Sequence, residues 1–174
     1  MSELITPLTK VFYPSLEELG VFTEIGESDL PEQQQTLLAH HDHMTVTNEA
    51  WHNSLVDVRV LQEHRQGDVY ARKIVLTLQR DGTPVQFGLM RIDLAGLPQI
   101  VRLEIESQAL PLGRIMIRHH LLREVELCKL WRITPGPDLR LQLQLGEEPC
   151  VYGRSARILV DGRSIVELLE IVHP

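Results

Sequence analysis

Polar and apolar residues alternate along several segments of the chain, which is the pattern of half-buried β-strands. In the segment 70–78, one face would carry Tyr70, Arg72, Ile74, Leu76 and Leu78. The same phase places Arg154 among apolar residues in 152–160 and Glu170 among apolar residues in 166–172. A charge at a core-facing position is costly unless it is paired or serves a ligand. We therefore expect these three charges to point inward, with Arg72 and Glu170 lining one enclosed cavity that suits a small anion.

The spacing of polar and apolar residues, with helix-start and turn residues, predicts the other elements. Strands are expected at 56–60, 69–79, 85–94, 100–106, 139–145, 151–160 and 164–172, and helices at 15–19, 32–41 and 111–131. An Asp81-Gly82 pair at the centre of 80–84 predicts a hairpin between two of these strands. Connections of two to five residues favour antiparallel pairing, because parallel strands need longer crossovers. The fold class expected is α+β, with about six antiparallel strands.

Composition narrows the function classes. The chain has 174 residues, with 43% hydrophobic and 24% charged residues, and we expect one domain over 1–174 whose polar segment 1–32 is peripheral. A net charge of −7 argues against nucleic acid or an acidic membrane as a partner. No run is apolar enough for a bilayer and the first ten residues lack a secretory signal, so a cytoplasmic protein with reduced Cys128 and Cys150 is expected. The pattern does not predict an oligomeric state.

Several short motifs occur in a fixed order over about 38–174. They are Asp42-His43-Met44-Thr45, Tyr70-Ala71-Arg72-Lys73-Ile74-Val75-Leu76, Asp81-Gly82-Thr83-Pro84, Leu110-Pro111-Leu112-Gly113-Arg114, Tyr152-Gly153-Arg154-Ser155 and Glu170-Ile171-Val172. With this order and spacing the chain resembles the chorismate pyruvate-lyase family, whose fold is shared with ligand-binding domains of some bacterial transcription regulators. The resemblance implies a single antiparallel sheet with helices on one side and a closed internal ligand cavity.

The resemblance also implies roles for individual residues. Met44 would touch the ligand through its backbone, Arg72 would pair with a substrate carboxylate, and the amides near Leu112 and Gly113 would face the ligand. Glu170 matches the family glutamate that faces a ring hydroxyl or ether oxygen, but this match needs a gap of one residue. An ungapped match would place Leu169 there, and Glu167 is a rival carboxylate.

The function expected from the resemblance is elimination of pyruvate from chorismate to leave 4-hydroxybenzoate. Arg72 would hold a carboxylate by a bidentate pair, and Glu170 would be the general acid on the departing ether oxygen. Neither a metal nor an organic cofactor is expected. The alternative is a binding or sensor protein that uses the same cavity for an aromatic carboxylate without turnover, since a fold does not determine a function.

Other polar residues have two interpretations each. His40, His41, Asp42, His43 and His52 form a cluster that suits a transition metal and a metal-dependent enzyme, but their spacing is also that of ordinary histidines at a helix end. His119 falls on the apolar stripe of the helix expected at 111–131, as a buried structural residue or as a residue lining the cavity. Arg154 is a structural ion-pair partner or a second ligand contact.

Overall fold

The computed structural model describes residues 5–121 and 124–174. Seven antiparallel strands form one sheet in the order β1-β5-β6-β7-β4-β3-β2. The strands are β1 (Gly20–Ile25), β2 (Val56–Gln66), β3 (Val69–Leu78), β4 (Pro84–Asp93), β5 (Glu124–Pro135), β6 (Val151–Val160) and β7 (Arg163–Val172). The α-helices are α1 (Ile5–Thr9), α2 (Glu32–Leu38), α3 (Met44–His52), α4 (Gln99–Glu106), α5 (Leu112–Arg118) and α6 (Pro137–Leu143), and 3₁₀ turns span Leu16–Glu18, Glu27–Asp29 and Leu94–Gly96.

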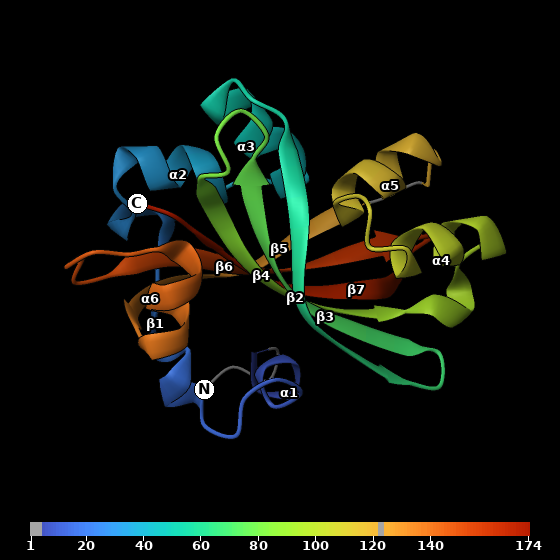
Figure 1. Ribbon diagram of the computed structural model, residues 1–174, viewed down its shortest axis with the longest axis horizontal. Coiled ribbons are helices and arrows are strands. Elements are labelled where there is room, and N and C mark those ends of the chain that lie inside the picture. Colours follow the sequence, from blue (N-terminus) through green and yellow to red (C-terminus); the bar gives the residue numbers. More distant parts are fainter. Residues whose placement is uncertain (1–4, 122–123) are drawn as a thin grey trace.

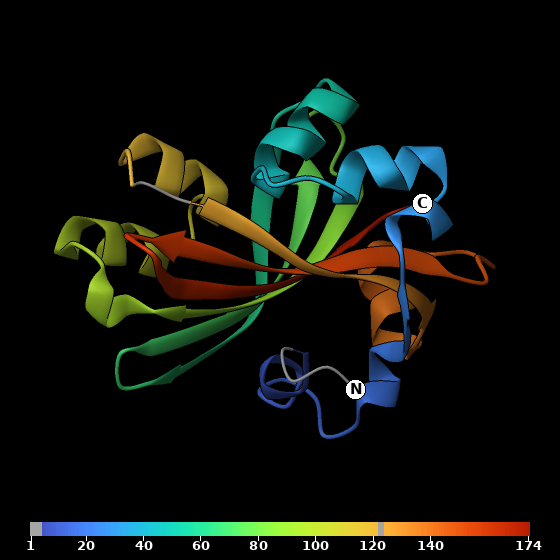
Figure 2. The ribbon, with the colours of Figure 1, turned by 180° about the vertical axis from the view of Figure 1, so that it is seen from behind.

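Both faces of the sheet are covered. Helices α2, α3, α4 and α5 lie over one face, as Figures 1 and 2 show, and α1 and α6 lie over the other. The central strands are therefore apolar on both sides, because each face buries its side chains against helices. The α+β class and the single antiparallel sheet with helices over its ligand face are confirmed.

The inward phase predicted for three strands is confirmed as well. Ile74 on β3, Ile158 on β6 and Leu168 on β7 belong to one buried cluster with α4 and α5. Arg72 and Arg154 have no solvent exposure, and Glu170 is 7% exposed. The face predicted to be the core face thus holds all three charges.

Two of the predicted strands are wrong. Residues 100–106 form α4 and residues 139–145 fall largely in α6, because in both segments the buried positions are four apart. In α6 Leu139 and Leu143 are buried while Leu141 is 72% exposed, which a strand would not produce. A leucine at every second position fits both periods, so alternation alone could not separate them.

The helix predicted over 111–131 is also wrong. The helix α5 ends at Arg118, and His120 adopts a left-handed φ of 50° that helical residues do not take. β5 begins at Glu124 and pairs with β1 and β6, so tertiary pairing overrides the local helical spacing. Residues 44–52, for which no element was predicted, form α3.

The segment 1–32, expected to be peripheral, contributes to the packed structure over its described part. Ile5 and Leu8 of α1 are 1% exposed and pack in a cluster with Phe87 and Leu89 of β4. β1, which was not predicted, pairs with β5 and forms one edge of the sheet. Within the described residues, no helix combines the length and apolar character that a membrane crossing requires.

Candidate ligand-binding site

A cavity of about 30 Å³ lies between the sheet and the ends of two helices, α3 and α5. Its walls are His43, Met44, Thr45, Ile74, Leu76, Gln86, Met90, Pro111, Leu112, Gly113, Val125, Arg154, Ile158, Leu168 and Glu170. A water molecule occupies about 30 Å³ of liquid, whereas pockets for small organic ligands measure roughly 300–1,000 Å³. The site as it stands is therefore too small for an organic molecule and would have to expand to hold one.

The floor of the cavity is β4, which lies near the centre of the sheet. Gln86, Gly88 and Met90 share the face that carries the cavity, because residues two apart in a strand point the same way. A Cβ atom on Gly88 would lie 3.1 Å from Cγ1 of Ile74. The missing side chain at this position lets Ile74 of the neighbouring strand pack closely over the backbone of Gly88.

Arg154 has a nearly complete set of protein partners. Its Nε donates to Oε2 of Glu170 at 2.7 Å, from the directly opposite position on β7. Its Nη1 donates to the carbonyl oxygen of His40 at 2.9 Å and its Nη2 to that of Asp42 at 3.0 Å. Arg154 therefore ties the connection between α2 and α3 to the sheet, and it has little capacity left for a ligand anion.

Arg72 is buried without comparable partners. Its Nε contacts the sulfur of Met90 at 3.1 Å, its Nη1 lies 3.5 Å from the carbonyl oxygen of Ile105, and its Nη2 has no hydrogen-bond partner in the described part of the chain. Thioether sulfur is a weak acceptor, and 3.5 Å is a long hydrogen bond. Burial lowers the pKa of Arg72, while Tyr70 and Glu63 nearby act in the opposite direction. The guanidinium is thus a desolvated cation with few hydrogen bonds.

Met90 connects this cation to the cavity. Arg72 does not line the cavity, but Met90 both lines it and contacts the Arg72 guanidinium. Methionine is unbranched and flexible, so its thioether can change rotamer at low cost. Displacement of this one side chain would bring Arg72 into contact with a ligand in an enlarged cavity.

The roof of the cavity is formed where the first turns of α3 and α5 meet. A Cβ atom on Gly113 would lie 2.8 Å from Oγ1 of Thr45, so only glycine allows this approach. An ion pair between Arg114 and Glu49 joins the same two helices beside the contact. The roof therefore rests on a close helix contact and one partly exposed ion pair.

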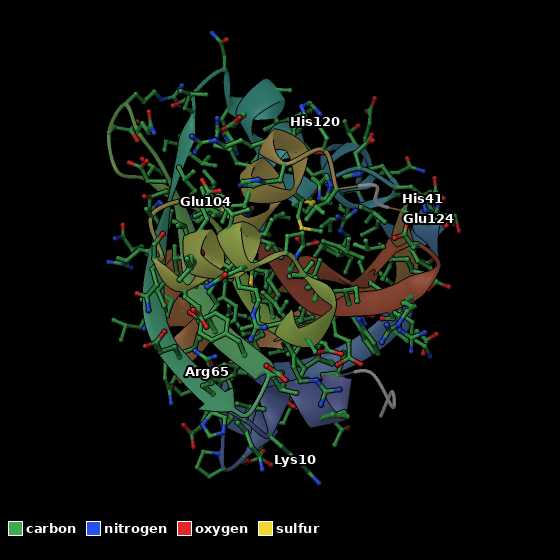
Figure 3. The ribbon with its side chains drawn as sticks, turned by 90° about the vertical axis from the view of Figure 1, so that its right-hand side faces the viewer. Lys10, His41, Arg65, Glu104, His120 and Glu124 are labelled. Carbon is green, nitrogen blue, oxygen red and sulfur yellow. The ribbon has the colours of Figure 1, made fainter. Side chains whose placement is uncertain are left out.

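The structure places the predicted site residues in three groups. Met44, Leu112, Gly113, Arg154 and Glu170 line the cavity. Arg72 lies one side chain behind its wall. His119 lies outside the lining, at the end of α5, where it contacts Glu104 on α4; Figure 3 shows Glu104 projecting from that helix.

The rival positions for the family glutamate lie on the other face of the sheet. Glu167 pairs with Arg91 at 2.8 Å, and Leu169 is buried in the cluster with α1 and α6. Glu170 alone of these three belongs to the cavity lining. The match that includes the gap of one residue is therefore the one that reaches the cavity.

The histidine cluster is dispersed over separate contacts. His40 contacts the carbonyl oxygen of Leu37 at 2.7 Å, and His41 contacts that of Val125 at 3.0 Å, near Glu124 at the start of β5 (Figure 3). Over residues 5–121 and 124–174, no group of three or more His, Cys, Asp and Glu side chains is placed to hold a metal ion. The cluster thus helps to anchor the α2–α3 connection.

Two polar residues at the cavity were missed from sequence. Asn48 on α3 is fully buried, and its Nδ2 donates to Oε1 of Gln86 at 2.6 Å. Gln86 is 2% exposed and lines the cavity. A signal existed, because Gln86 is a polar residue in phase with Met90 and Ile92 in an otherwise apolar strand.

Comparison with known proteins supports the fold. No protein-family model and no curated protein matches the sequence. A crystal structure from Bacillus subtilis, described as a possible transcriptional regulator, matches 99% of this chain and 85% of its own, with 11% identity and a TM-score of 0.53. The ligand-binding domain of a protein proposed to be a GntR-family transcriptional regulator from Bordetella bronchiseptica matches 69% of this chain and 83% of its own, with 11% identity and a TM-score of 0.50.

A gene product from Staphylococcus aureus is similar to the same degree. It covers 68% of this chain and 82% of its own, with 8% identity and a TM-score of 0.51. At these identities the likeness establishes the fold alone. That fold is the one implied by the resemblance to the lyase family and shared with the regulator domains, and the likeness does not extend to the lyase reaction.

Proposed function

We propose that this chain binds a small aromatic carboxylate in an expanded form of the cavity, as a binding or sensor module without turnover. The observation that carries the proposal is Arg72, a fully buried guanidinium whose Nη2 has no hydrogen-bond partner among the described residues. A buried cation in this condition is costly, and an anion supplied by a ligand would relieve that cost. The likeness to ligand-binding domains of GntR-family regulators favours sensing over catalysis.

The shape of the site also supports a flat ligand. Ile74, Leu76 and Leu168 supply apolar walls on which an aromatic ring could pack. The carboxylate would displace the Met90 thioether and form a bidentate pair with Arg72. The two flexible methionines in the lining, Met44 and Met90, would allow the expansion.

Calorimetric titration with benzoate and 4-hydroxybenzoate tests the proposal. A good charged hydrogen bond contributes on the order of 1.5–3 kcal/mol, so Arg72→Ala should weaken binding roughly ten- to a hundredfold. Arg72→Lys should weaken it less, because lysine keeps the charge and loses the two-pronged geometry. Arg157→Ala on the same sheet, at a partly exposed position, serves as the control. Failure of the wild type to bind either acid would refute the proposal.

The lyase reaction remains a prediction of the sequence, and Glu170 in the cavity lining is the feature that suits it. Incubation of the purified protein with chorismate, followed by assay of pyruvate and 4-hydroxybenzoate, decides between the two functions. Glu170→Gln should keep an oxygen for Arg154 while removing the acid, so turnover would collapse and binding would largely survive. Release of pyruvate by the wild type would replace the sensor proposal with the enzyme.

A further inference from the structure

The polar pair beneath α3 has a defined orientation that follows from its partners. Nδ2 of Asn48 donates to the carbonyl oxygen of Met44 at 3.0 Å and to Oε1 of Gln86 at 2.6 Å. The Met44 carbonyl can only accept, so Asn48 must present its amino group on this side. That amino group donates to the oxygen of Gln86, which sets the orientation of the Gln86 amide.

Because its oxygen is engaged by Asn48, Gln86 keeps its amino group as the donor that remains at this part of the cavity lining. Gln86 is 2% exposed and lines the cavity. Among the described residues, none accepts a hydrogen bond from its Nε2. An unpaired buried donor carries a desolvation cost that a ligand acceptor would remove. Asn48 itself is not part of the lining, and its amino group bonds to Gln86 and to the Met44 carbonyl, so it acts as a positioning residue.

A carboxylate oxygen lies next to this donor. Glu170 and Gly88 are direct partners across β7 and β4, which makes Gln86 a diagonal neighbour of Glu170 on the cavity face. Oε2 of Glu170 accepts from Arg154, and its Oε1 has no partner among residues 5–121 and 124–174. Glu170 thus lies opposite the midpoint between Gln86 and Met90, and its carboxylate disfavours a second anion beside Gln86.

The two ends of the site suit a ligand with one ring. Gln86 and Met90 are four residues apart on β4, or roughly 13 Å at 3.3 Å per residue. The amide reaches inward from one end, and the Arg72 guanidinium lies beside Met90 at the other. Gly88 lies between them with no side chain. A benzoate-sized molecule spans the distance that remains between the two polar groups.

We infer that Gln86, oriented by Asn48, determines ligand specificity by donating a hydrogen bond to a neutral oxygen at the end of the ligand opposite its carboxylate. This inference rests on the proposed function and narrows it: the ligand is a monoanion whose other end carries a hydroxyl or ether oxygen. A hydroxyl would accept from Gln86 and donate to Glu170. A dicarboxylate would place its second charge against Glu170 and would bind more weakly.

Titration with two matched pairs of ligands tests the inference. In each pair one member has the oxygen and the other an apolar group of similar size: 4-hydroxybenzoate with 4-methylbenzoate, and 4-methoxybenzoate with 4-ethylbenzoate. A neutral hydrogen bond of about 0.5–1.5 kcal/mol corresponds to a preference of roughly 2- to 13-fold for the oxygen. Gln86→Met should abolish this preference in both pairs.

Controls separate the possible failures. Gln34→Met replaces another buried glutamine, outside the lining, and should keep the preference. Asn48→Ala should reduce the preference for the oxygen-bearing acid. The double variant with Asn48→Ala and Gln86→Met should show a preference no smaller than that of Gln86→Met alone. Binding of none of the four acids by the wild type would overturn the proposed function and this inference together. Binding with equal preference in the wild type and Gln86→Met would overturn this inference only.

A measurement on the wild-type protein tests the same hydrogen bond without a variant, so it remains valid if the variants fail to fold. The side-chain amide resonance of Gln86 in a ¹⁵N-correlated spectrum should shift on addition of 4-hydroxybenzoate and shift much less on addition of 4-methylbenzoate. Equal shifts with the two acids would contradict the proposed hydrogen bond. Terephthalate should bind at least tenfold more weakly than 4-hydroxybenzoate, and equal affinity would refute the exclusion of a second charge.

Discussion

Two buried arginines on the same face of the sheet have different roles at the scale of single residues. Arg154 has three hydrogen-bonded acceptors, one of them a carboxylate, whereas Arg72 has a sulfur atom and one distant carbonyl. The sequence marks both as inward charges, and only the partners distinguish a structural cation from one available to a ligand.

Substitution by methionine should therefore have opposite effects on the two. Arg154→Met leaves Glu170 buried without its partner, and we expect the free energy of unfolding to fall by about 3–5 kcal/mol. Arg72→Met removes an underpaired buried charge, and the ligand-free protein should be as stable as the wild type or more stable. Urea unfolding of both variants measures this, and an equal loss in the two would contradict the assignment.

His40 provides a pH-dependent contribution to stability. Its Nδ1 accepts from the Asp42 amide and faces Nη1 of Arg154, while its Nε2 donates to the Leu37 carbonyl, so the neutral ring fits this site. Burial, followed by the charge of Arg154, lowers the pKa of His40 below its ordinary value of 6.5. Near pH 6 the His40 ring therefore binds a proton more readily in the unfolded chain than in the folded protein.

The sign of the effect follows from that difference. The stabilising contribution is complete above pH 6.5 and declines as the pH falls below it, so the free energy of unfolding should drop between pH 7.5 and pH 5.5. His40→Gln should show a smaller drop. Burial also lowers the pKa of His52, so part of the dependence should remain. An unchanged slope in His40→Gln, measured by urea unfolding at each pH, would argue against His40 as a source.

At the scale of elements, α3 and α5 meet over the cavity. The Arg114–Glu49 ion pair joins the two helices, with side chains 34% and 18% exposed, so solvent screens part of its energy. Glu49 also accepts from the Val56 amide at 3.1 Å, which a glutamine oxygen could still do. The ion pair can thus be weakened without removing the connection to β2.

Glu49→Gln should speed ligand association by a fewfold, because the roof would open more often. The free energy of unfolding should change by less than about 1 kcal/mol. Glu104→Gln is the matched control, since it breaks the pair with Arg118 on the outer side of α5. Stopped-flow measurement with 4-hydroxybenzoate gives the rates, and equal rates in both variants would show that the ion pair does not limit access.

At the scale of the whole molecule, the sheet needs cover on both faces. Helix α1 buries Ile5 and Leu8 against strands that form the back of the ligand site, and Tyr13 donates to Asp138 of α6 at 2.6 Å. The N-terminal segment is therefore part of the cooperative structure, at the side of the sheet opposite the cavity.

Removal of residues 1–13 should destabilise the entire sheet, because it exposes Phe87 and Leu89 at the centre of the back face. Leu8→Ala should have a smaller effect of about 2–5 kcal/mol, the usual cost of a large-to-small change in a core. Thermal unfolding followed by far-UV circular dichroism measures both. A truncated chain with the midpoint of the full-length protein would show that α1 is dispensable.

The sequence by itself determined the fold class and the phase of its central strands. Strict alternation on β3, β6 and β7 identified the face that carries Arg72, Arg154 and Glu170, since a side chain in a strand has only two directions. The hairpin at Asp81-Gly82 could also be predicted from the sequence, because a tight turn needs a residue with positive φ and glycine adopts one without strain. In the structure Gly82 has a φ of 77°. These features depend on local geometry and on nothing far away in the chain.

Some segments fit both the alternation of a strand and the spacing of a helix, and only the tertiary structure decided between the two. Leu139, Leu141 and Leu143 are compatible with alternation and with helical spacing, and the packing of α6 on the back face selected the helix. Residues 124–135 became a strand because β1 and β6 offered partners on both sides. Tertiary contacts likewise separated Arg72 from Arg154 and oriented Gln86, since a hydrogen-bond partner more than 30 residues away leaves no local pattern in the sequence.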